Sequence, residues 1–183
     1  TQSARPASRR AIASSTGVIT PTDIQVRDES GFGAGTVPAV HAGPLALYAS
    51  HDHKRVRAAM YDLQTSGWNS KDVTFLADHI TAAMVKELHF ARAPFGSIVC
   101  LLHDGTLAIC TFDPSEGVTA WWHYETSGTI RSVAVGDNGG DVGLWMAVTR
   151  TNGTYLERLP WSDVERYVDS FVVGAVAADG TVA

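Results

Sequence analysis

Residues 97–112, which read Ser-Ile-Val-Cys-Leu-Leu-His-Asp-Gly-Thr-Leu-Ala-Ile-Cys-Thr-Phe, decide the fold class of this 183-residue chain. Two apolar arms, residues 97–103 and 106–112, flank the pair Asp104-Gly105. Both members of that pair tolerate the positive φ angles that a tight hairpin turn requires. The stretch therefore predicts an antiparallel β-hairpin.

The two cysteines of the chain lie one in each arm of this hairpin. A two-residue loop would place Cys100 opposite Ile109 and Val99 opposite Cys110. Successive side chains of a strand alternate between the two faces of a sheet, so the cysteines would point to opposite sides and form no disulfide. A bulged, three-residue loop would reverse that expectation.

Two further hairpins are predicted downstream, each with apolar arms around turn-forming residues. They are residues 118–125 with 129–135 around Thr126-Ser127-Gly128, and residues 142–150 with 154–159 around Asn152-Gly153. Upstream, residues 45–49 and 56–61 flank a polar tip at 51–54 and predict another strand pair. Consecutive antiparallel pairs of similar size indicate a meander, either propeller-like or a twisted open sheet.

One amphipathic helix is predicted over about residues 70–89. Asn69 and Ser70 can cap its start, and Asp72 would lie in the first turn, where a negative charge is favourable. Apolar residues then recur at steps of three and four along the segment, as on the core-facing side of a helix. They are Val73, Leu76, Ile80, Ala83, Met84 and Leu88.

The predicted fold is therefore mainly β (α+β): an antiparallel hairpin meander with one amphipathic helix packed against it. Residues 1–16 are rich in Ala, Ser, Thr and Arg without a clear period, and we expect a flexible N-terminal arm or linker there. Residues 17–183 are expected to form a single β-rich domain.

Charge and hydropathy narrow the classes of function. The formal net charge is -5 and the sequence pI is near 5.7, which argues against a nucleic-acid-binding surface because phosphates are neutralised by clustered Lys and Arg. No stretch approaches the roughly 20 apolar residues that cross a bilayer, so no membrane association is expected.

The sequence offers few groups for chemistry. Seven histidines are scattered along the chain, and only His51-Asp52-His53 brings two together, on a predicted turn tip without a third ligand. We therefore predict no metal site, no cofactor and no catalytic residue. Asp113 and Glu116 could imitate a glycosidase carboxylate pair, but acids at this spacing in a Pro-Ser turn are usually turn-forming residues.

Three aromatic residues are the predicted contact residues. Trp121 and Trp122 are adjacent in a predicted strand and would point to opposite faces, one to the core and one outward. Together with Tyr124 they form a possible protein interface or glycan contact.

Short motifs follow one another in a fixed order along the chain. They are Asp72-Val73-Thr74-Phe75-Leu76-Ala77-Asp78-His79-Ile80, Ala93-Pro94, Leu102-His103-Asp104-Gly105-Thr106-Leu107, Thr111-Phe112, Ala120-Trp121-Trp122-His123-Tyr124, Leu144-Trp145, Val148-Thr149-Arg150 and Leu156-Glu157-Arg158-Leu159. In order and spacing they resemble the tail tubular and nozzle proteins of short-tailed bacteriophages.

The resemblance implies a structural component of the virion, made in the cytoplasm of the bacterial host and placed in the phage tail. Members of that family form a ring that encloses the DNA channel and carry a propeller-like β domain. The implied partners are other tail or portal-proximal proteins and further copies of the chain, with DNA only as passing cargo. Such proteins are usually much longer, so we expect an excised domain or a shortened relative. Two alternatives stay open: a glycan-binding module that recognises the host surface, and a glycan hydrolase.

Overall fold

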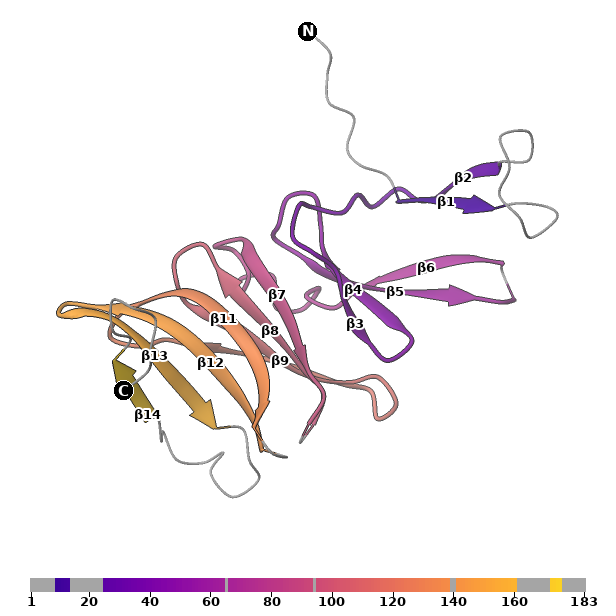
Figure 1. Cartoon of the computed structure of the whole chain (residues 1–183). Coiled ribbons are helices and arrows are strands. Elements are labelled where there is room, and N and C mark those ends of the chain that lie inside the picture. The colour runs from indigo at the N-terminus through magenta and orange to yellow at the C-terminus, as the bar shows by residue number, and fades with distance from the viewer. Residues whose placement is uncertain are drawn as a thin grey trace, which may run out of the picture.

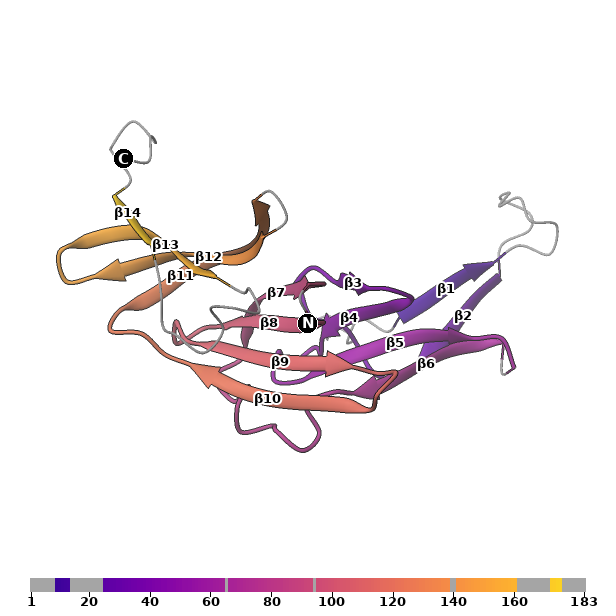
Figure 2. The same ribbon diagram turned by 90° about the horizontal axis from the view of Figure 1, so that it is seen from below.

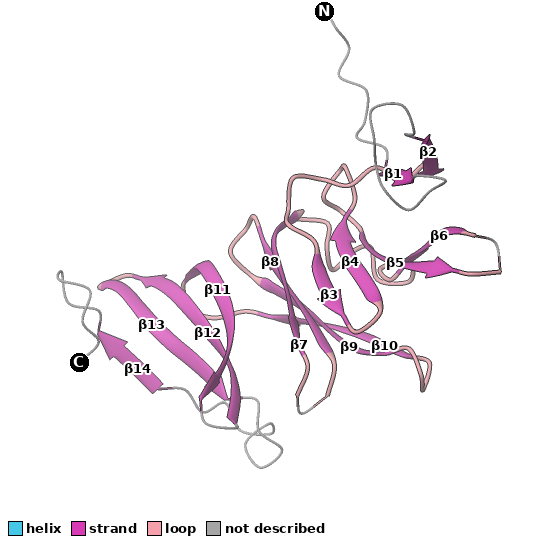
Figure 3. Cartoon of the chain, turned by 45° about the vertical axis from the view of Figure 1, so that its right-hand side comes forward, coloured by secondary structure: helices cyan, strands magenta, loops and turns pink. Residues whose placement is uncertain are grey.

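The computed structural model describes residues 9–13, 25–64, 66–93, 95–138, 141–160 and 172–175. These residues form strands, turns and loops and contain no helix (Figures 1 and 3). The described part of the chain therefore has no membrane-spanning helix. The strands are β1 (Arg9–Ala13), β2 (Gln25–Ser30), β3 (Val40–Ala42), β4 (Leu45–Ala49), β5 (Val56–Asp62), β6 (Gly67–Asp72), β7 (Val85–Ala91), β8 (Ser97–Leu102), β9 (Leu107–Asp113), β10 (Val118–Tyr124), β11 (Thr129–Asn138), β12 (Asp141–Arg150), β13 (Gly153–Pro160) and β14 (Val172–Ala175).

Three four-stranded antiparallel sheets make up the body of the molecule (Figures 1 and 2). We call them sheet I (β3–β6), sheet II (β7–β10) and sheet III (β11–β14). In each sheet the strands follow one another in chain order, which confirms the predicted mainly β, antiparallel meander. Strands β1 and β2 form a separate two-stranded ribbon.

Sheet II lies between two apolar cores. Alternate residues of β8 and β9 point to opposite faces, and Cys100 and Cys110 belong to the core shared with sheet I. Leu101 and Ile109 belong to the core shared with sheet III. All six residues of β8 are buried. Burial on both faces explains why residues 97–112 are apolar almost without alternation.

Hydrogen bonds from the edge of sheet II fix the start of β11. Lys86 Nζ donates to the carbonyl of Arg131 at 2.6 Å, and Glu87 Oε2 accepts from Val133 N at 3.0 Å. The amide of Ile130 donates to the carbonyl of Gly105 at 3.0 Å, which ties the turn between β8 and β9 to the same strand. Sheets II and III are therefore joined by polar contacts as well as by their shared core.

The connection from β10 to β11 is held by one arginine. The guanidinium of Arg150 makes two hydrogen bonds to the buried carboxylate of Glu157, at 2.5 and 2.7 Å. It also donates to Ser127 Oγ at 2.7 Å and Thr126 Oγ1 at 3.0 Å. A planar fork of donors suits such bidentate and branched bonding. Arg150 thus fixes residues 126–127, where the chain passes from sheet II to sheet III.

The register of the 97–112 hairpin differs by one residue from the two-residue-loop prediction. Cys100 pairs with Ala108 and Ile98 pairs with Cys110. The loop contains three residues, since Leu102 N bonds Thr106 O at 2.9 Å, and Gly105 adopts a φ of 85°. The two cysteines consequently lie on the same face, as expected for the longer loop, and both are free thiols.

Both thiols are expected to be unreactive in the folded protein. Burial raises the pKa of Cys100, and it raises the pKa of Cys110 to about 12. The thiolate is the reactive form, so protonated buried thiols resist modification. A disulfide-exchange reagent such as DTNB at mildly alkaline pH should titrate neither cysteine in native buffer and both in concentrated guanidinium chloride. Fast titration of the native protein would contradict this assignment.

Of the other predicted hairpins, two form and one does not. Strand β4 pairs with β5, and β12 pairs with β13, where Arg150 lies opposite Gly153. The predicted pairing of residues 118–125 with 129–135 is wrong. Strand β10 pairs with β9, and β11 pairs with β12, so residues 125–128 form a crossing between two sheets.

The predicted helix over residues 70–89 is wrong. Ser70 and Asp72, assigned to its cap and first turn, lie in β6 opposite Ala59 and Arg57. The loop that follows contains separate turns, with bonds three residues apart such as Ala77 N to Thr74 O at 2.8 Å. Strand pairing with β5 removes the helix start. Of the apolar residues assigned to the helix, Val73, Ile80 and Ala83 contact the core from the loop, Leu88 does so from β7, and Leu76 and Met84 are exposed.

The predicted flexible arm at residues 1–16 lies mostly outside the described residues. Within it, Arg9–Ala13 forms β1, which pairs with β2. Sheets I, II and III pack in sequence through two shared cores (Figure 2). The propeller-like arrangement stays a prediction.

Candidate functional site

Strand β10 carries the three predicted contact residues and forms an edge of sheet II. Trp121 and Trp122 point to opposite faces of the strand. Trp121 packs against the core shared with sheet I, and its indole Nε1 donates to the carbonyl of Val73 at 3.0 Å. Tyr124 packs against the core shared with sheet III. Trp121 and Tyr124 therefore anchor the strand.

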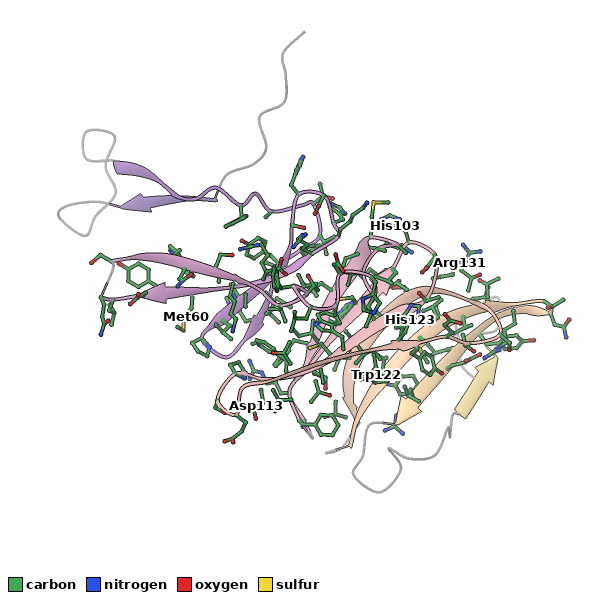
Figure 4. All side chains as sticks on the ribbon, turned by 180° about the vertical axis from the view of Figure 1, so that it is seen from behind. Met60, His103, Asp113, Trp122, His123 and Arg131 are labelled. Atoms are coloured by element: carbon green, nitrogen blue, oxygen red, sulfur yellow. The ribbon has the colours of Figure 1, made fainter. Side chains whose placement is uncertain are left out.

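Trp122 is the residue of the three that faces solvent, with 41% of its surface exposed (Figure 4). Val118, 40% exposed, and exposed Ala120 lie on the same face of β10. We call these three side chains the β10 row. On the neighbouring strand β9, the residues that pair with them are Asp113, Thr111 and Ile109, in that order for Val118, Ala120 and Trp122. The row is thus an apolar strip at a sheet edge, without a charged side chain of its own.

A chain of polar contacts supports the other face of β10. Thr106 Oγ1 lies 2.9 Å from His123 Nε2 and donates to Asp104 Oδ1 at 2.7 Å. Nδ1 of His123 lies 3.2 Å from a carboxylate oxygen of Glu125. This series of polar contacts joins the turn between β8 and β9 to the end of β10. The spacing of the histidines in the sequence does not mark His123, because only the β9–β10 pairing brings it beside Thr106.

The carboxylate of Asp113 stabilises the turn that joins β9 to β10. Its Oδ1 accepts hydrogen bonds from Ser115 Oγ at 2.5 Å, Ser115 N at 3.0 Å and Glu116 N at 3.2 Å. The Ser115 hydroxyl is the main cause of the lowered pKa of Asp113. A glycosidase general acid requires a raised pKa. The bonding of Asp113 therefore matches the turn interpretation of the Asp113 and Glu116 pair.

The turn before β5 and the loop before β7 together form a shallow hollow of about 360 Å³. Its lining mixes charges of both signs: Asp52, Lys54, Arg55, Asp78, His79 and Ala82. Arg55 is also bonded to Asp72 at 2.7 Å, and Asp52 accepts from Lys54 N at 3.2 Å. The polar groups of this hollow are thus partly used in local contacts.

One histidine of the tip at residues 51–54 has a structural role. His53 is half-buried, its Nε2 accepts from Thr36 N at 3.3 Å, and its ring fills the space where Gly35 has no side chain. His51 is exposed. Across the residues that the structure describes, no group of three His, Cys, Asp or Glu side chains is placed to hold a metal ion.

Exposed apolar side chains also gather away from β10. The hairpin of β5 and β6 extends beyond β3 and β4 (Figure 1), and it exposes Met60, Tyr61 and Leu63. Tyr61 packs edge-to-face on Trp68, with ring centroids 5.8 Å apart. In the loop before β7, Phe75 is also exposed. Apolar surface of this kind is typical of protein contact sites.

No protein-family model matches the sequence, and no curated protein matches it either.

Proposed function

We propose that this chain is a structural module of a bacteriophage tail, of the tail tubular or nozzle kind, that acts through protein–protein contacts. The observation that carries the proposal is an exposed apolar row at the edge of a buried sheet. The central strands of sheet II, β8 and β9, are covered on both faces, while the β10 row remains apolar and exposed. Such a surface suits docking of a protein partner.

Three further observations support the tail assignment. The motifs between Asp72 and Leu159 resemble the family in order and spacing. Consecutive four-stranded meanders that share cores face to face are the arrangement of neighbouring propeller blades, so we propose a propeller-like domain in the assembled tail. The net charge of -5 suits a channel wall that does not grip DNA.

In this role the chain has no catalytic residue and no cofactor. Its partners are other tail or portal-proximal proteins and further copies of itself in a ring, with DNA as passing cargo. Its place is the virion.

The proposal is tested by binding to purified portal–tail complexes of the phage that encodes the chain. Trp122→Ala should weaken binding by about 2 kcal/mol or more, roughly 30-fold, because truncating an interface tryptophan has large effects. Phe75→Ala, which removes an exposed aromatic outside β10, is the matched control and should change binding less. Absence of wild-type binding to these complexes would overturn the proposal.

Glycan binding is the second candidate function, favoured by the exposure of Trp122 alone. An indole ring at a surface can stack on a sugar ring. Selective binding on a glycan array that disappears in Trp122→Ala would support this candidate. Polysaccharide cleavage that is lost in Glu116→Gln would instead support the hydrolase.

A further inference from the structure

Edge strands expose unpaired backbone groups that can pair with another chain, and proteins protect them by shortness, charge or bulges. Five of the six edge strands in sheets I to III have such protection. Strand β3 has three residues and β14 has four. Strand β6 contains Lys71 and Asp72.

The two edges where sheets II and III meet are protected twice. Strand β7 contains Lys86 and Glu87 and has a register shift between Val85 and Glu87. Strand β11 contains Arg131 and has a shift beside it. Bulges of this kind twist an edge and interrupt regular pairing.

Strand β10 lacks every one of these devices. It has seven residues, Val-Thr-Ala-Trp-Trp-His-Tyr, with no Lys, Arg, Asp, Glu or Pro. All seven pair with β9 without a shift, so the strand is regular along its whole length. Within the described part of the chain, no backbone hydrogen bond joins β10 to any strand or loop except β9.

We propose that β10 pairs antiparallel with β10 of a second copy of this chain, about a two-fold axis at Ala120. The sheets of the two copies then join into one continuous sheet. This inference is independent of the tail assignment, because it needs only the regular, uncharged edge.

The sequence of β10 is complementary to itself in that register. With Ala120 opposite its own equivalent, Trp122 lies opposite Val118 of the second copy, and Trp121 lies opposite Thr119. Both are pairs of an aromatic with a β-branched residue, a favourable cross-strand combination. The two large members of the β10 row, Val118 and Trp122, are exposed in one copy and cover each other across the axis.

Charges outside the strand do not oppose this pairing. The same register places Glu116 opposite Tyr124 of the second copy and Glu125 opposite Ser115. No two like charges face each other in this register. A copy of the chain is therefore the occupant that the residues of β10 fit.

Sedimentation velocity over a range of concentrations tests the proposal on the full chain. We expect a reversible dimer, weakened at least about tenfold by Ala120→Lys, because two lysines would then face each other across the axis. The matched control is Ala134→Lys, at an exposed position of the already charged edge β11, which should leave the dimer unchanged. Circular dichroism would check that both variants keep their strands.

Disulfide trapping gives an independent result. Ala120→Cys should form a disulfide-linked dimer under mild oxidation, because only a residue on the axis faces its own equivalent; Ala134→Cys should not. Cys100 and Cys110 are buried and do not compete. A chain that stays monomeric at all concentrations, or a dimer that survives Ala120→Lys, would overturn the proposal. Binding of the wild-type chain to portal–tail complexes reports on the proposed function separately; Ala120→Lys is not used for that measurement, because Ala120 belongs to the β10 row.

Discussion

Leu101→Ala is expected to lower the free energy of unfolding by about 2–5 kcal/mol, since a truncated core leucine loses transfer energy and leaves a cavity. Leu101 is fully buried in the core between sheets II and III. Its strand is covered on both sides, so neighbouring side chains have little freedom to close the gap. Urea unfolding followed by tryptophan fluorescence measures the loss.

The same substitution at an exposed leucine is the control. Leu63 is 84% exposed in the turn between β5 and β6, and Leu63→Ala should change the free energy of unfolding by no more than about 0.5 kcal/mol. Equal losses at the two positions would contradict the placement of sheet II between two cores.

Gly105→Ala is expected to destabilise the protein by about 3 kcal/mol or more, combining left-handed backbone strain with a steric clash. Gly105 has a φ of 85°, and an added Cβ would overlap the Cγ2 methyl of Thr129 and lie 3.3 Å from Ile130 N. The turn would have to move away from β11 and lose the bond between Gly105 O and Ile130 N. Thermal and urea unfolding measure the effect.

Gly117 separates the two causes. It has a φ of 70° but nothing within 4 Å of an added Cβ, so Gly117→Ala should show the backbone strain alone, about 1 kcal/mol. Thr129→Ser removes the clashing methyl and should recover part of the loss in Gly105→Ala. If the two glycine variants were equally stable, the turn would not be packed against β11.

Local turn chemistry explains which strand pairs could be predicted. Both hairpins predicted at Asp104-Gly105 and Asn152-Gly153 form. Gly105 supplies the positive φ at the first turn, whereas at the second Arg150 pairs with Gly153 and residues 151–152 form the loop. The register at Asp104 was open, because Asp104 Oδ1 also accepts from Thr106 N at 3.0 Å and favours the longer loop. Such a bond depends on a side-chain rotamer that sequence spacing does not specify.

Tertiary contacts explain the errors. Residues 125–128 have the composition of a hairpin turn, but Arg150, which is distant in sequence, fixes them as a crossing between sheets. The apolar spacing over residues 70–89 matched a helix, yet the pairing of β6 with β5 outweighs it. Propensity is a weak guide where long-range strand pairing competes.

The candidate site was predictable in part. Alternation along a strand placed Trp121 and Trp122 on opposite faces from sequence alone. Which of them is exposed depends on sheet I, since Val73 accepts the indole hydrogen bond of Trp121. The missing charges of β10 were visible in the sequence, but they acquire meaning only because β10 is an edge.

The burial of sheet II on both faces limits where the chain can be divided. A fragment that ended after β10 would leave Val99, Leu101, Leu107 and Ile109 in water, because sheet III covers them. A fragment that began at β7 would uncover the opposite side in the same way. Deletion of either outer sheet would thus expose a buried apolar face of sheet II, so a stable truncation has to keep all three sheets.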